Sequence, residues 1–284
     1  MKKMFAWIIA LMLTAGFACA ETILPERAIP LPMDEKLEID LDSDGEAEKV
    51  QIRMEGVEEE ACLRILIEGT DGAMNIYDTW IMYPETCFAT DMNGDGMLEI
   101  LLSGDLQSND YFTWCLNYDL EYGIRALPFA DANRGMNTGE YSEMGYGKII
   151  AQEGTSITLC GSQDVLGTWM ADRTFGLQDG MFEFLDDGMW IMQDITSDEF
   201  TWDYSCLNPI KEVPVTLEDG SEGTLAAGEK FVITYTDKLS IAGFVTQEGK
   251  KGTITLTENT EEGWGHMING AADYEYFEYI PYAD

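Results

Sequence analysis

The sequence has little positive charge and almost no histidine. Its 284 residues include 53 aspartates and glutamates, 16 lysines and arginines and one histidine, which gives a formal net charge of −37 at pH 7. A surface this negative repels phosphate backbones, so we expect no nucleic acid partner. The single histidine, His266, has no nucleophile signature beside it, which leaves a Ser-His-Asp or Cys-His catalytic site without support. Acidity of this kind suits a cationic partner or a calcium-rich fluid, or serves only to keep the protein soluble.

Long apolar runs are also scarce, and the one clear example lies at the N-terminus. Lys2 and Lys3 precede an apolar stretch over residues 4–13, which is followed by Ala18-Cys19-Ala20. This order predicts a signal peptide over residues 1–20 that is cleaved before Glu21, and therefore a secreted or cell-surface protein. The run is too short to span a membrane, and no second stretch approaches that length, so we expect no membrane span. A lipid anchor at Cys19 remains an alternative, although Gly16 stands where such anchors carry leucine.

Cysteines are few and their spacing forms no known motif. Removal of the signal peptide leaves five: Cys62, Cys87, Cys115, Cys160 and Cys206. An odd count leaves at least one thiol unpaired, and the absence of C-x-x-C or histidine-bearing clusters gives no support to zinc or redox chemistry. Most of them lie in apolar, strand-like contexts, so we expect buried small hydrophobic residues, with a disulfide possible but not assignable.

No window shows sustained helical periodicity, and the fold class that follows is all-β. Runs rich in β-branched and aromatic residues alternate with glycine, aspartate and asparagine. Residues 169–177 and 181–185 flank a D-G turn and predict a hairpin. The predicted strands cover residues 49–54, 62–68, 98–103, 111–118, 149–152, 156–160, 168–177 and 181–185.

The most specific motif is an acidic, glycine-containing loop that occurs twice, 51 residues apart. Both copies read D-x-(D/N)-x-D-G-x-x-E and run directly into an apolar strand. Side-chain oxygens at positions one, three and five converge when the chain turns tightly, and glycine at position six permits the turn. The predicted ligands are Asp40, Asp42, Asp44, Glu46 and Glu48 in the first loop, and Asp91, Asn93, Asp95, Met97 and Glu99 in the second.

Oxygen donors in this pattern indicate calcium, and the spacing excludes an EF-hand. An EF-hand needs a bidentate glutamate at position twelve, which is Gln51 in one copy and Leu102 in the other. Here the last carboxylate stands at position nine, and the position-seven residues Glu46 and Met97 would contribute backbone carbonyls. The alternative is that an acidic chain produces acidic turns by chance. Two copies that match at all five diagnostic positions favour a metal site.

With these loops, residues 36–127 resemble the FG-GAP-type calcium-loop repeats of integrins and of bacterial secreted proteins. In that family a D-x-D-x-D-G loop joins strands within each blade of a β-propeller. Each loop here leads to a strand, a polar break and a second strand, a unit of about 50 residues that has the size of a propeller blade. The resemblance implies a propeller-like or stacked-sheet repeat domain over residues 21–206, with structural calcium and a binding or scaffold role. It fades after residue 128, where no third loop is visible.

The remaining segment, residues 207–284, predicts five short strands with tight turns. With Gly228-Glu-Lys before one strand and Gly249-Lys-Lys-Gly before another, it resembles a small bacterial Src-homology-3-like barrel. The resemblance implies a docking module for a protein, peptide or cell-wall polymer. The Lys250-Lys251 turn either meets an acidic partner or only solubilises a hairpin. Most aromatic residues here are expected to be core, with Trp264 and Tyr282 as candidates for exposure.

Two functions from different classes follow from these observations. The leading hypothesis is a non-enzymatic, calcium-binding protein of the cell surface or secreted fraction, whose small barrel docks a partner. The alternative is a secreted hydrolase that acts on glycan or peptide through carboxylates between residues 128 and 206. Trp169, Trp190 and Trp202 would form a sugar-stacking platform in that case, but we expect them to fill the interface between sheets.

Overall fold

The computed structural model describes residues 28–56, 61–107, 110–129, 142–185, 189–192, 206–260 and 265–282. The predicted signal peptide, Trp202 and Trp264 lie outside these residues. The described chain is all-β, and its one helical element is a 3₁₀ turn, η2, at Asp273–Glu275. Within this part of the chain, no helix is long and apolar enough to cross a membrane.

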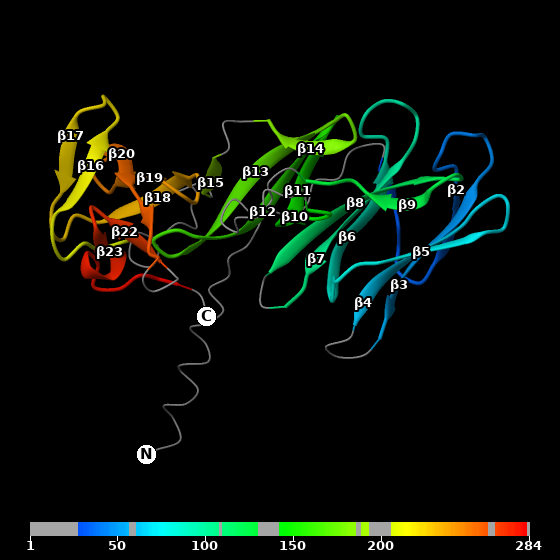
Figure 1. Cartoon of the computed structure of the whole chain (residues 1–284), viewed down its shortest axis with the longest axis horizontal. Coiled ribbons are helices and arrows are strands. Elements are labelled where there is room, and N and C mark those ends of the chain that lie inside the picture. Colours follow the sequence, from blue (N-terminus) through cyan, green and yellow to red (C-terminus); the bar gives the residue numbers. More distant parts are fainter. Residues whose placement is uncertain are drawn as a thin grey trace, which may run out of the picture.

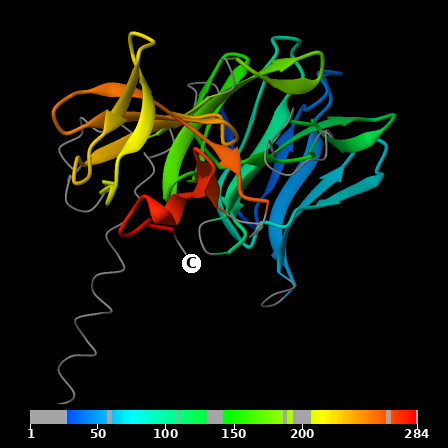
Figure 2. The same ribbon diagram turned by 60° about the vertical axis from the view of Figure 1, so that its left-hand side comes forward.

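Three antiparallel meanders of four strands follow one another along the chain. The second meander also pairs with β1 (Ile29–Pro30) through its first strand and with β10 (Gly145–Tyr146) through its third strand. Figure 1 shows the three meanders in sequence order along the long axis, and the turned view in Figure 2 shows the same order. The first consists of β2 (Lys36–Ile39), β3 (Glu48–Glu55), β4 (Cys62–Glu68) and β5 (Met74–Asp78). The second consists of β6 (Tyr83–Thr90), β7 (Glu99–Asp105), β8 (Tyr111–Asp119) and β9 (Gly123–Ala126). The third consists of β11 (Lys148–Glu153), β12 (Ser156–Asp164), β13 (Thr168–Gln178) and β14 (Met181–Phe184).

The second meander is the middle layer of the stack, and both of its faces are buried. Ile100 and Leu102 of β7 belong to the core shared with the first meander, while Leu101 between them belongs to the core shared with the third. Successive side chains of a strand point to opposite faces, so a strand that is covered on both sides carries a continuous apolar run. This explains why β7 is buried over nearly its whole length and does not alternate.

The eight strands predicted from residue patterns before position 186 are all present, with ends that differ by at most a few residues. The predicted hairpin is β13–β14, and Gln178 pairs with Met181 across it. Its two turn residues, Asp179 and Gly180, have φ angles of 51° and 79°. Positive φ at both positions gives the turn geometry that matches the right-handed twist of paired strands. The all-β prediction is confirmed.

The C-terminal strands join the third meander in one ten-stranded sheet. The link is β15 (Trp190–Met192), which pairs with β13 through Ala171–Met192 and with β18 (Phe231–Thr236) through Trp190–Thr236. Beyond β18 the order is β19 (Ile241–Thr246), β20 (Lys251–Thr255), β16 (Val213–Leu217) and β17 (Glu222–Leu225). A separate small sheet contains β21 (Thr257–Glu258), β22 (His266–Ile268) and β23 (Ala271–Ala272).

The five short strands predicted in residues 207–284 are therefore present as β16–β20, but the described sheets do not close into a barrel. The core also continues across residue 206, since Trp190 and Ala171 belong to the same apolar cluster as Phe231 and Phe244. The domain boundary at residue 206 stays a prediction. The ten-stranded sheet and this apolar cluster both include residues on each side of it. Trp169 packs against the same cluster, so packing is confirmed for Trp169 and Trp190.

Candidate metal centre

The two acidic loops are the connections of two equivalent hairpins. Residues 40–47 join β2 to β3, the first two strands of the first meander, and residues 91–98 join β6 to β7, the first two strands of the second. The position-nine glutamates, Glu48 and Glu99, are the first residues of β3 and β7, where they are 0 % and 3 % exposed. Each loop thus begins at the end of one strand and is held by a buried carboxylate at the start of the next.

The loops share a set of hydrogen bonds, position for position. The position-six amide donates to the position-one carboxylate, at 3.1 Å from Gly45 to Asp40 and 3.0 Å from Gly96 to Asp91. The position-two amide donates to the position-nine glutamate, at 2.8 Å from Leu41 to Glu48 and 2.9 Å from Met92 to Glu99. The side chains at positions three and five accept from the amides two residues onward: Asp42 from Asp44, Asn93 from Asp95, Asp44 from Glu46, and Asp95 from Met97.

The backbone conformation is shared as well. Gly45 and Gly96 at position six have φ angles of 92° and 91°, which is the left-handed region that the sequence motif requires of a glycine. Position four is left-handed too, with φ of 58° at Ser43 and 79° at Gly94. Sequence reasoning missed this second left-handed position, although glycine in one copy and serine in the other is a usable signal for it.

Three carboxylates of the first loop come together. Asp40, Asp42 and Glu48 each offer one oxygen, and these three oxygens lie within 4.8 Å of one another. Two oxygens, Oδ1 of Asp40 and Oε1 of Glu48, are buried and have no hydrogen-bond partner in the described part of the chain. The other oxygen of each carboxylate accepts a backbone hydrogen bond, Oδ2 of Asp40 from Gly45 and Oε2 of Glu48 from Leu41. A buried carboxylate oxygen without a donor is costly, and a cation among the three would satisfy it.

Burial and nearby like charges oppose the ionisation of carboxylates in both loops. Burial raises the pKa of Asp42, and the nearby charges of Asp44 and Asp40 raise it further. Burial raises the pKa of Glu48 as well, with a further contribution from Asp42. In the second loop, burial raises the pKa of Glu99 to about 7, and Asp95 adds to the effect. Like charges that are crowded in this way resist ionisation until an opposite charge is present.

The second loop differs from the first in one respect. The side-chain amide of Asn93 donates to Oδ2 of Asp95 at 2.9 Å, so one potential ligand oxygen is already engaged. Among the described residues, only the first loop brings three carboxylates within the range of one metal ion. The predicted ligand roles of Asp44, Asp91, Asn93, Asp95 and Glu99, and of the carbonyls of Glu46 and Met97, stay predictions.

Two residues that the sequence did not indicate lie at this centre. The hydroxyl of Ser43 donates a hydrogen bond to the carbonyl of Gly96, which links the first loop to the second. Tyr118, from β8, is 1 % exposed; burial and then the charges of Glu48 and Asp42 raise the pKa of its hydroxyl. Ser43 and Gly96 are 53 residues apart, and Tyr118 is farther still from Glu48 in the sequence, so local pattern does not reveal either relationship.

The third meander has no such loop. Its corresponding strands β11 and β12 are joined by Gly154 and Thr155 alone, between Glu153 and Ser156. A turn of two residues has no room for the nine-residue ligand pattern. This explains why the repeat fades in the sequence after residue 128, although the meander itself continues.

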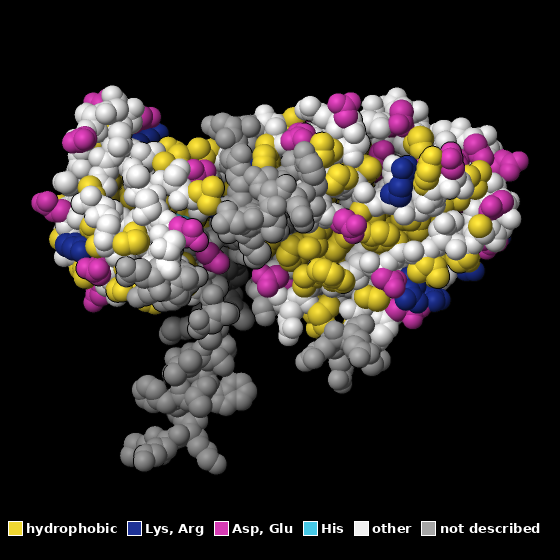
Figure 3. All heavy atoms as spheres, viewed as in Figure 1, with side chains coloured by type: hydrophobic (Ala, Val, Ile, Leu, Met, Phe, Trp, Pro, Cys, Tyr) yellow, Lys and Arg dark blue, Asp and Glu magenta, His cyan; other side chains and the backbone are white. Residues whose placement is uncertain are grey.

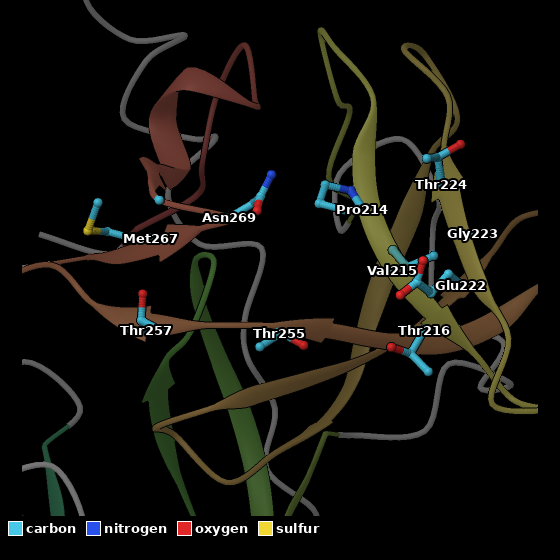
Figure 4. Close-up of a pocket in the computed structure, with 11 residues that line it drawn as sticks. Pro214, Val215, Thr216, Glu222, Gly223, Thr224, Thr255, Thr257, Met267 and Asn269 are labelled. Carbon is cyan, nitrogen blue, oxygen red and sulfur yellow. The ribbon is translucent and has the colours of Figure 1, made fainter.

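A groove of 680 Å³ lies in the C-terminal part of the chain. Figure 4 shows it between the β16–β17 hairpin, which carries Pro214 and Thr224, and the turn at Asn269, with Thr255 and Thr257 between them. Glu222 is the one ionisable residue that lines it. The groove therefore carries one acidic side chain and is rich in hydroxyl groups. On the face in Figure 3, acidic side chains are scattered widely and basic ones are few.

Lys250 and Tyr282, which the sequence indicates as candidates for partner binding or exposure, both make contacts within the chain. Lys250 is engaged internally, with its ammonium 2.9 Å from Glu229 and 2.8 Å from the carbonyl of Thr224. Tyr282, a candidate for exposure, is half-buried, and its hydroxyl donates to Asp273 at 3.1 Å. No disulfide joins any two of the five described cysteines; Cys115 and Cys160 are buried and the other three are partly buried.

No protein-family model, curated protein or solved structure matches this chain.

Proposed function

We propose that this chain is a calcium-stabilised binding protein of the secreted or cell-surface fraction. The observation that carries the proposal is the first loop, in which two buried carboxylate oxygens accept no hydrogen bond from any described residue and belong to a cluster of three carboxylates. A donor set made only of carboxylates suits hard cations such as calcium and magnesium, and not zinc or copper. Calcium fits better, because it accepts many oxygens in flexible geometry, whereas magnesium demands near-ideal octahedral coordination.

The role of the ion is structural. Glu48 and Glu99 anchor each loop at the first residue of a strand, so an ion bound there holds the end of the hairpin closed. The three successive four-stranded meanders also support a short or degenerate β-propeller of FG-GAP type, with calcium loops in the first two blades. In this proposal the C-terminal strands form the Src-homology-3-like docking module.

The partner, a peptide or cell-wall polymer, docks in the groove lined by Thr255 and Thr257. We assign it there and not to the Lys250-Lys251 turn, because Lys250 already pairs with Glu229. Filling the groove with Thr257→Trp is expected to abolish retention on purified cell-wall polymer, whereas Lys251→Glu is expected to leave retention unchanged. Equal retention of the two variants would remove the groove from the docking site. The hydrolase alternative, which depends on carboxylates between residues 128 and 206, is not proposed.

Thermal unfolding with calcium and with chelator tests the central part of the proposal. A ligand held only by the native state stabilises it by about 2.7 kcal/mol at a hundredfold excess over its Kd. We expect calcium to raise the Tm of the wild-type chain, and Glu48→Gln to remove most of that rise. Glu46→Gln is the matched control, because it removes the same charge from an exposed side chain of the same loop and leaves the backbone carbonyl in place. An equal calcium response in both variants would contradict the proposal.

A further inference from the structure

A second cavity lies where the first meander meets the second. It has a volume of 250 Å³ and is lined by three aromatic rings, Tyr77, Trp80 and Trp114, together with the carboxylates of Asp78 and Glu143. Tyr77 and Asp78 end β5, Trp80 lies in the connection to β6, and Trp114 is in β8. The cavity is therefore built from two layers of the stack and from the segment that precedes β10.

The aromatic residues differ in exposure, and the difference gives the cavity a buried side and a rim. Trp114 is 4 % exposed and belongs to the core between the two meanders, whereas Trp80 is 68 % exposed. A tryptophan with most of its apolar surface in water does not contribute the favourable free energy that burial of the ring would give. Because Trp80 lies at the rim of the cavity, a ligand that enters the cavity would cover its ring.

One carboxylate of the cavity is neutralised and the other is not. Asp78 forms a two-bond ion pair with Arg64, at 2.6 and 2.7 Å. Glu143 accepts a hydrogen bond from the Tyr77 hydroxyl at 3.0 Å, which fixes its position without cancelling its charge. No lysine or arginine in the described part of the chain pairs with Glu143. Burial and the bond to Glu143 raise the pKa of Tyr77, so this hydroxyl stays a donor.

We infer that this cavity binds a primary alkylammonium group, of the kind that a lysine side chain of a partner presents. Aromatic faces attract cations, and a fixed carboxylate accepts the hydrogen bonds that an ammonium donates. The net charge of −37 draws cations and repels anions. The cavity is smaller than the roughly 300 Å³ at which sites for whole small molecules begin, which suits a side chain or a head group.

The inference rests on the binding role proposed above but not on calcium. The probes are N-acetyl-lysine methylamide, choline and methyl β-glucoside, each titrated into the full mature chain by calorimetry in calcium and in chelator. We expect the lysine amide to bind most tightly, choline more weakly and the glucoside not at all. Cation–π contacts of this kind predict that Trp80→Ala weakens lysine-amide binding about 5- to 30-fold.

Two further variants and one control separate binding from folding. Glu143→Gln should weaken binding and reduce its dependence on salt, and Tyr77→Phe should weaken it while keeping the ring. Tyr83→Ala is the matched control, because Tyr83 is 60 % exposed close to Trp80 in sequence but does not line the cavity. Circular dichroism checks that each variant is folded.

Three outcomes would overturn the inference: no binding of the lysine amide, equal affinity in Trp80→Ala and the wild type, or tighter binding of choline or the glucoside. Loss of the ammonium site with an intact calcium response of the Tm would leave the calcium proposal standing. A missing calcium response with intact ammonium binding would contradict the calcium proposal and leave the ammonium site standing.

Discussion

The backbone amide of Leu98 donates a hydrogen bond of 2.8 Å to the carbonyl oxygen of Leu41. Leu98 is the last residue of the second acidic loop and Leu41 lies at position two of the first, so the two loops are joined directly through their backbones. The Ser43 hydroxyl adds a second link through the carbonyl of Gly96. The amide of Leu41 donates to the carboxylate of Glu48. Leu41 therefore bonds the buried carboxylate of the first loop through its amide and the second loop through its carbonyl.

This connection predicts that the two proposed calcium sites are coupled. Asp42→Ala should remove binding at the first loop and also weaken calcium binding at the second about fivefold or more, the usual lower range for coupled sites. The effect arises because an unfilled first loop no longer holds Leu41 and Ser43 in place. Calorimetric titration of wild type, Asp42→Ala and the control Glu46→Gln measures it.

Ser43→Gly tests the side-chain part of the link. It removes the hydroxyl without strain, because Ser43 already has positive φ and the equivalent residue is Gly94. The two sites should then bind with reduced cooperativity. Unchanged cooperativity in Ser43→Gly, together with an unaffected second site in Asp42→Ala, would show that the loops act independently.

The junction between the third meander and the C-terminal strands depends on Trp190. This side chain is 1 % exposed in the cluster that also contains Leu207 and Phe231. Trp190→Ala should lower the free energy of unfolding by about 3–5 kcal/mol, as large-to-small core substitutions do. Ile191→Ala in the same strand is the control, because Ile191 is 51 % exposed and should change stability by less than about 1 kcal/mol.

Urea unfolding gives both values for this junction. A single cooperative transition that shifts as a whole in Trp190→Ala would show that residues on both sides of position 206 unfold together. A loss confined to one of two transitions would instead support the separate domain that the sequence predicts.

Lys238 predicts a dependence of stability on pH. Its ammonium lies 4.9 Å from the Tyr146 ring and 5.4 Å from Trp190, near Asp164 and Arg173. Burial lowers the pKa of Lys238 to about 8, against the opposing charge of Asp164 and with the like charge of Arg173. In the unfolded chain a lysine titrates near about 10.4.

Between these two pKa values the unfolded state binds the proton that the native state has released, so stability should rise as the pH increases from about 8 to 10.4. Below pH 8 the native state contains a charged lysine in an unfavourable environment. Lys238→Met should therefore remove the rise and stabilise the chain at pH 7, by up to about 3 kcal/mol. Chemical unfolding of both proteins across this pH range checks the difference, and parallel pH profiles would exclude Lys238 as the cause.

The sequence predicts this fold well where the interactions are local. Alternation identifies the β4 strand Cys62–Glu68, and the D-x-D-x-D-G spacing identifies both loops and the left-handed glycine at position six of each. The fold is less predictable where contacts are long-range. Tyr77 and Glu143 are 66 residues apart, and Lys250 meets Glu229 across a sheet. The junction through β15 was also missed, because a three-residue strand carries too little periodicity to be recognised.

A crystal structure of the chain at saturating calcium, with anomalous scattering recorded, would show whether the first loop binds calcium. We expect an anomalous peak in this loop at about 2.3–2.6 Å from oxygens of Asp40, Asp42 and Glu48. The two buried oxygens that lack donors, Oδ1 of Asp40 and Oε1 of Glu48, should be among its ligands. A map with no peak at this position, or with these oxygens bonded only to water, would contradict the claim that the loop is a calcium site.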